Sequence, residues 1–78
     1  MLDPSTLSQL SIGDIAIIRA MPQGVESMTR LRELGLVPGT KIRLVRRAPM
    51  GDPIEVAVRG SRFAMRRSEA QRIEVQPE

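Results

Sequence analysis

The sequence predicts a mainly β protein, a small and partly open β-barrel of about five short strands with one short α-helix. Three observations lead to this prediction. The chain has only 78 residues, apolar and polar residues alternate through most of its second half, and one segment of its first half has a helical period instead. Alternation is typical of antiparallel strands with one buried face, and a short sheet buries that face by curling on itself. We expect one domain over residues 1–78.

The first elements are a helical turn and a strand. Leu7 and Leu10 lie three residues apart, on one face of a turn that we place over residues 4–10. The apolar run Ile15–Ile18 is short and rich in β-branched residues, which favours a strand over a helix.

A helix is expected from Val25 to Leu34, where apolar residues recur every three positions. Gly35 then stands where a left-handed C-terminal cap belongs, because glycine enters that conformation without a Cβ clash. Leu36 is expected to fold back on the last helical turn, so that Leu34 and Leu36 both anchor the corner. Pro38-Gly39 predicts a type II turn that starts the next strand.

From Thr40 onward the period is two. The apolar members of the alternation, which we expect to point inward, are Ile42, Leu44, Ile54, Val56, Val58, Phe63, Met65, Ile73 and Val75.

Two turns set the register of these strands. A type II′ turn at Gly60-Ser61 would place Val58 opposite Phe63 and Val56 opposite Met65. The loop of residues 48–52 would place Val56 opposite Leu44 and Val58 opposite Ile42. Both hairpins put their apolar residues on the same face, and a slip by one residue would destroy that agreement.

Composition argues against catalysis and against a resident cofactor or metal. The sequence contains no cysteine and no histidine, so a disulfide, a thiolate site and a serine–histidine pair are excluded. The carboxylates are scattered over turns and strands, and the glycines have neither a Walker nor a dinucleotide-binding spacing. We therefore expect no enzyme, no cofactor and no metal site.

Charge and hydropathy indicate a soluble cytoplasmic protein and argue against nucleic-acid binding. Twelve basic and nine acidic residues are interleaved along the chain, and Phe63 is the one aromatic residue. This disfavours nucleic-acid binding, which uses clustered cations and stacking platforms. No apolar run is long enough to span a bilayer, and the start of the chain does not read as a secretory signal.

The candidate contact residues lie at the end of the helix, at a hairpin tip and on the outer face of the sheet. Arg59 and Arg62 are expected to face each other across the Gly60-Ser61 turn, where two cations repel unless an anion sits nearby. The candidates for contact with a partner are Met28, Arg32, Glu33, Arg43, Met50, Ala57, Arg59, Arg62 and Ala64. The residues assigned to architecture are Leu34, Gly35, Leu36, Pro38, Gly39 and Gly60.

Several short motifs follow one another in a characteristic order. They are Leu7-Ser8-Gln9-Leu10 before Gly13-Asp14, Arg30-Leu31 before Leu34-Gly35-Leu36-Val37-Pro38-Gly39, Ala48-Pro49-Met50-Gly51-Asp52-Pro53-Ile54, Val58-Arg59-Gly60, and Arg66-Arg67 with Glu69-Ala70. In order and spacing they resemble the FeoA family of bacterial ferrous iron uptake, from about Leu7 to Val75. The resemblance implies an SH3-like barrel without enzymatic activity. It also implies a cytosolic accessory that docks on the cytosolic region of a membrane GTPase-type Fe(II) transporter and modulates its activity or assembly.

Two alternatives stay open at this point. One is a nucleic-acid-binding SH3-like barrel, favoured by the arginines. The other is a stand-alone relative of the C-terminal SH3-like domain of iron-dependent repressors. A polyproline-binding SH3 domain is not supported, because its groove needs several aromatic side chains. Membrane contact is expected only through the transporter, and self-association is left open.

Overall fold

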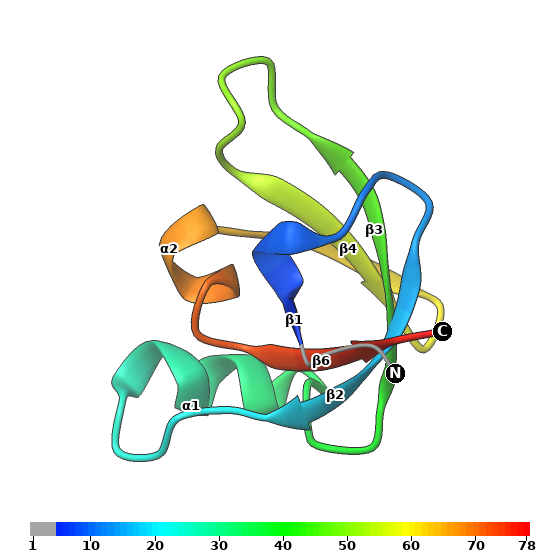
Figure 1. Ribbon diagram of the computed structural model, residues 1–78. Coiled ribbons are helices and arrows are strands. Elements are labelled where there is room, and N and C mark those ends of the chain that lie inside the picture. The colour runs from blue at the N-terminus through cyan, green and yellow to red at the C-terminus, as the bar shows by residue number, and fades with distance from the viewer. Residues whose placement is uncertain (1–4) are drawn as a thin grey trace.

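The computed structural model describes residues 5–78 and consists mainly of short strands (Figure 1). In chain order the elements are β1 (Ser5–Thr6), the 3-10 helix η1 (Leu7–Gln9), β2 (Ile15–Ala20), α1 (Glu26–Glu33), β3 (Lys41–Arg47), β4 (Ile54–Val58), β5 (Ser61–Met65), α2 (Arg67–Ala70) and β6 (Glu74–Pro77).

The six strands found in residues 5–78 belong to one antiparallel sheet with the order β1-β6-β2-β3-β4-β5. Among the described residues, the end strands β1 and β5 do not pair with each other, so the barrel is partly open. Figure 1 shows α1 along one end of the molecule and the β3–β4 hairpin projecting from the opposite end. The mainly β, partly open architecture is confirmed, and the described part of the chain has six strands where about five were expected.

The core is filled by side chains from the inward positions of the strands and from α1. In β4 the alternation is complete, because Ile54, Val56 and Val58 are buried while the residues between them are half-buried. Phe63 is only partly buried but packs against this core. The predicted single interior of the sheet is therefore confirmed.

The β3–β4 hairpin has the predicted register. Leu44 pairs with Val56 and Arg43 with Ala57, and a bulge follows between Leu44 and Arg46. The loop and the alternation agree because each independently requires the same residues on the buried face.

The register predicted for the β4–β5 hairpin is wrong by two residues. Val56 pairs with Phe63 and Val58 with Ser61, because the turn residues are Arg59 and Gly60 rather than Gly60 and Ser61. Their φ angles of +52° and +82° are those of a type I′ turn. A shift of two keeps every side chain on its face, so the alternation did not reveal the error.

The corner after α1 is a Schellman motif followed by a type II turn, as predicted. The Leu36 amide donates to the Leu31 carbonyl and the Gly35 amide to the Arg32 carbonyl, each at 3.0 Å. Gly35 has a φ of +107°. Next, the Thr40 amide donates to the Val37 carbonyl at 3.1 Å across the Pro38-Gly39 turn.

One anchor of this corner was predicted wrongly. Leu36 is fully buried, but Leu34 is 51% exposed. Leu34 is the C-terminal cap residue, and the stripe that faces the core ends at Leu31, one turn earlier. Leu36 alone therefore provides the apolar contact that usually accompanies a Schellman cap.

The segment around η1 is held to the sheet by an arginine. The Nη2 atom of Arg47 donates to the carbonyl oxygens of Ser8, at 3.1 Å, and Leu10. The expected helical turn is thus a 3-10 turn over Leu7–Gln9, and Pro4, where the prediction began, lies outside the described residues.

Replacing Arg47 by methionine is expected to lower the free energy of unfolding by about 1 kcal/mol, since two carbonyl groups lose their donor. Arg46→Met is the matched control, because Arg46 lies 65% exposed and reaches Glu55 only at 4.0 Å. The Arg46→Met variant should lose about 0.5 kcal/mol or less of its free energy of unfolding. Urea unfolding of both variants compares them, and equal losses would contradict this role of Arg47.

Candidate functional site

The end of α1 offers fewer contact residues than the sequence suggested. Met28 is fully buried in the core, so its assignment as a partner contact is wrong. Arg32 is half-buried, and its Nη2 atom donates to the Pro22 carbonyl, which ties α1 to the loop before it. Glu33 alone of the three is freely exposed. Met28 belongs to the apolar stripe of α1 that ends at Leu31, and such a stripe faces the core rather than a partner.

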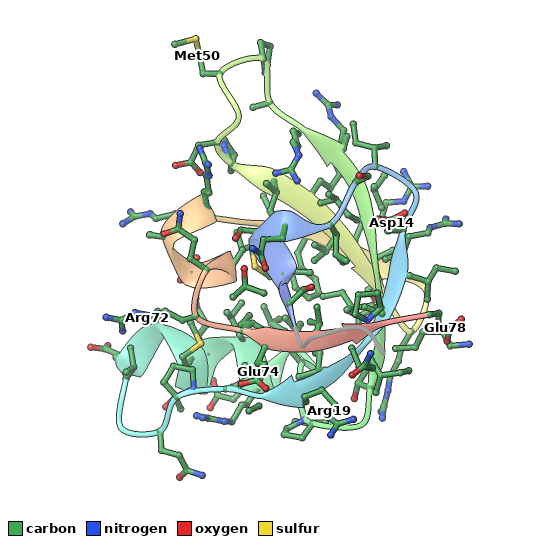
Figure 2. The ribbon with its side chains drawn as sticks, viewed as in Figure 1. Asp14, Arg19, Met50, Arg72, Glu74 and Glu78 are labelled. Atoms are coloured by element: carbon green, nitrogen blue, oxygen red, sulfur yellow. The ribbon has the colours of Figure 1, made fainter. Side chains whose placement is uncertain are left out.

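Met50 lies at the tip of the β3–β4 hairpin and is 91% exposed (Figure 2). Its position at an exposed tip agrees with the sequence-based expectation. Contact of this side chain with a partner stays a prediction.

The registers predicted for the two hairpins would align Arg43, Ala57 and Ala64 in one row on the outer face of the sheet, and the structure does not have this row. Arg43 pairs with Ala57, but Ala57 then pairs with Arg62, while Ala64 pairs with Glu55. The two-residue shift of the β4–β5 hairpin causes the change.

Arg59 and Arg62 do not face each other, because Arg59 is a turn residue and Arg62 lies in β5. Their predicted repulsion is therefore wrong. Arg62 instead lies 3.9 Å from one oxygen of Glu55, and Arg46 lies 4.0 Å from the other. Two arginines flank one carboxylate here, which leaves this part of the face cationic.

A groove of about 560 Å³ opens on this outer face, and we call it the outer groove. It combines the start of β2, the corner before β3, the first half of β3 and the end of the β4–β5 hairpin. Its lining residues are Ile15, Gly39, Thr40, Lys41, Ile42, Arg43, Ala57, Arg59 and Gly60. Three sequence candidates, Arg43, Ala57 and Arg59, are thus brought together. The contributions of Ile15, Thr40, Lys41 and Ile42 were missed, and Gly39 and Gly60 had been assigned to architecture alone. Ile15 joins the groove only through the pairing of β2 with β3.

A second groove of about 600 Å³, the helix groove, lies between α1 and the segment from β5 to α2. It is lined by Glu26, Ser27, Arg30, Pro53, Ala64, Met65, Arg66 and Glu69. Of the sequence candidates, only Ala64 lies here.

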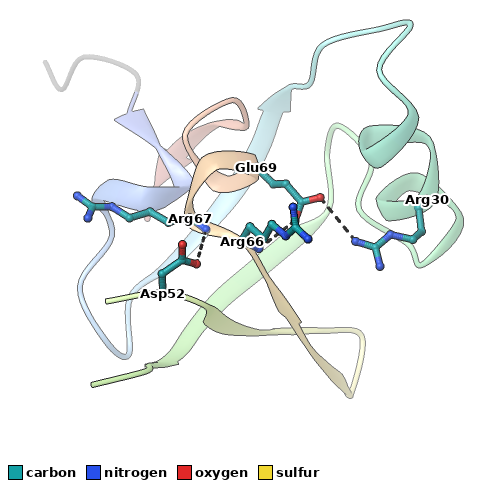
Figure 3. Close-up of polar contacts among 5 residues, drawn as sticks. All are labelled: Arg30, Asp52, Arg66, Arg67 and Glu69. Atoms are coloured by element: carbon teal, nitrogen blue, oxygen red, sulfur yellow. Dashed lines mark hydrogen bonds and ion pairs between the residues drawn. The ribbon is translucent and has the colours of Figure 1, made fainter. Parts of the chain in front are cut away.

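Two carboxylate side chains at or near the helix groove, those of Glu69 and Asp52, are paired with an arginine or with backbone amides (Figure 3). Glu69 is almost buried, accepts the Arg66 amide at 2.9 Å and lies 3.6 Å from the Arg30 guanidinium. The Arg67 amide donates to Asp52 at 2.9 Å, which joins α2 to the β3–β4 loop. These contacts explain the short α2, which the sequence reading missed because an arginine is an unusual N-cap residue.

The described residues lack the donor set of a metal centre. Within residues 5–78, no three histidine, cysteine, aspartate or glutamate side chains lie close enough together to hold a metal ion. In the same part of the chain, no helix is both long enough and apolar enough to cross a bilayer.

The sheet order, the corner and the barrel-like interior define a small SH3-like domain. A model of the FeoA domain matches residues 5–77. The chain therefore belongs to the FeoA family, as the sequence motifs suggested.

Solved structures of the family support both the fold and the assignment. The FeoA protein of Chlorobium tepidum is 43% identical and superposes with a TM-score of 0.87, over 92% of this chain and 69% of that one. The FeoA of Stenotrophomonas maltophilia complexed with zinc, an SH3 domain protein, is 39% identical with a TM-score of 0.75, over 91% of this chain and 88% of that one.

A curated relative is a fusion of two proteins in one polypeptide. It is the Fe(2+) transport protein A/Fe(2+) transporter FeoB fusion protein of Porphyromonas gingivalis, which is 38% identical over 71 residues. The match covers 90% of this chain but only 8% of the fusion protein.

The fold is also found in a manganese-dependent transcriptional repressor. That structure superposes with a TM-score of 0.84 over 100% of this chain and 38% of the repressor, at 20% identity. At this identity the likeness shows the fold alone, so the alternative of a repressor relative receives no functional support from it.

Proposed function

We propose that this chain is a non-enzymatic accessory of bacterial ferrous iron uptake that docks on the cytosolic region of a membrane Fe(II) transporter and modulates its activity or assembly. The observation that carries the proposal is the Porphyromonas gingivalis relative, in which transport protein A and the transporter FeoB form one polypeptide. Fusion gives each of two domains a high effective concentration near the other. Separate chains need a docking surface to be held together in the same way.

The chemistry of the chain fits an accessory better than an enzyme. The sequence has neither histidine nor cysteine to serve as base or nucleophile. Two exposed grooves and a cationic outer face instead offer surface for another protein. We propose that residues 1–78 act as one domain on the cytoplasmic side of the membrane and reach the membrane through the transporter.

The test is affinity purification of the tagged chain from native membranes of its own organism. We expect the full-length ferrous iron transporter to co-purify, and deletion of the gene to slow ferrous iron uptake. An untagged strain controls for nonspecific recovery. Loss of co-purification together with normal uptake in the deletion strain would refute the proposal.

A further inference from the structure

The outer groove has a partly apolar floor and a cationic rim. Ile15 and Ala57 line it and are half-buried, whereas Lys41, Arg43 and Arg59 line it and are exposed. Among residues 5–78, no acidic residue lines it. The helix groove differs, because its two arginines are balanced by two glutamates.

Two of the rim cations have no carboxylate neighbour in the part of the chain that the structure describes. Among residues 5–78, neither Arg43 nor Arg59 lies within ion-pair distance of an acidic side chain, while Lys41 lies 3.3 Å from Glu78. A groove with one sign of charge focuses its field on an incoming group of the opposite sign. The charge therefore complements an acidic partner.

The conformation of Arg59 adds an independent observation. Its φ of +52° places a long side chain in the left-handed region, in the first position of a type I′ turn. Asparagine and glycine occupy this position readily, whereas other residues are disfavoured there. Strained backbone of this kind is common at functional sites. The chain carries a cation at a turn position where asparagine or glycine would be more stable.

We propose that the outer groove binds an acidic segment of the transporter's cytosolic region. Carboxylates of that segment pair with Arg43 and Arg59, and an apolar side chain of the segment packs on Ile15 and Ala57. This inference rests on the proposed function and specifies the surface that performs it. It favours a protein over a nucleic acid, because the groove contains no aromatic side chain for base stacking.

The decisive variant is Arg59→Asn, which should separate stability from binding. Because Asn-Gly is a preferred type I′ pair, the variant is expected to melt about 2–5 °C higher than the wild type. Its affinity for the full-length transporter in lipid nanodiscs should nevertheless fall by about fivefold, and that of Arg43→Gln/Arg59→Asn by about twentyfold at low salt. Surface plasmon resonance measures the affinities, and calorimetry measures the melting temperatures.

Arg72→Gln is the matched control, since it removes the same charge from an exposed arginine distant from the groove. Figure 2 shows Arg72 on the side of the molecule opposite Glu78, the partner of the rim residue Lys41. This control should bind within twofold of the wild type. The wild-type affinity should also fall more steeply with salt than that of the double variant.

The possible outcomes have distinct meanings. Unchanged binding of both groove variants, with wild-type binding intact, would overturn the outer groove as the docking site and leave the proposed function standing. Equal binding to empty nanodiscs of the same lipids, or tighter binding of a short single-stranded oligonucleotide, would overturn the acidic protein segment as the occupant. Absence of wild-type binding to the transporter would overturn the proposed function and this inference with it.

Discussion

Replacing Leu36 by alanine is expected to lower the free energy of unfolding by about 2–5 kcal/mol. Leu36 is fully buried and lies directly after the Schellman cap, where its side chain belongs to the apolar core. Truncation removes apolar contacts and leaves a cavity that a small, tightly connected core fills only in part. In a domain of this size the melting temperature should fall by at least about 8 °C.

Leu34→Ala is the matched control, since it removes the same atoms two residues earlier in the chain. Leu34 is 51% exposed, and its truncation should lower the free energy of unfolding by less than about 1 kcal/mol. Urea denaturation of both variants at one pH gives the comparison, provided that the slopes agree. Equal losses for the two leucines would contradict the observed orientation of the corner.

Replacing Gly35 by valine is expected to lower the free energy of unfolding by about 1–2 kcal/mol, because a β-branched residue is strained in a left-handed conformation. The φ of Gly35 is +107°. A Cβ atom at this position would lie 4.0 Å from a methyl carbon of Val58, which is ordinary contact. The expected loss therefore comes mainly from the backbone rather than from a clash.

Gly35→Asn separates these two causes. Asparagine adds a side chain but tolerates the left-handed region better than valine, so it should lose less stability than Gly35→Val. Guanidinium unfolding of the three proteins ranks them. A valine variant as stable as the glycine protein would show that the cap places no conformational demand on residue 35.

The corner and the β3–β4 hairpin were predictable because several local signals agree there. At the corner, glycine at the cap and proline-glycine at the turn indicate the same reversal of the chain. In the hairpin, the alternation on both sides of the loop indicates one register. The β4–β5 hairpin lacked this redundancy. Gly60 suits the first position of a type II′ turn and the second position of a type I′ turn equally well, and a period of two does not distinguish registers that differ by two.

The remaining parts of the fold and the outer groove could not be predicted, because they depend on pairing between segments that lie far apart in the sequence. β1 has two residues and pairs with β6, at the other end of the chain. Such a short strand has no period to detect. The outer groove also depends on nonlocal pairing. Arg43, Ala57 and Arg59 were therefore each identified as candidates, but their meeting in one groove was not predicted. It exists only because Ile15 of β2 lies beside Arg43 of β3.

The rim of the outer groove has a chemical consequence for labelling. Lys41 is the single lysine of the sequence, and its side chain is 63% exposed. An acylating reagent that reacts with primary amines therefore has one side-chain target, on the rim of the groove, besides the α-amino group. A photoactivatable tether attached there would report on whatever approaches this face, without the need to introduce a cysteine.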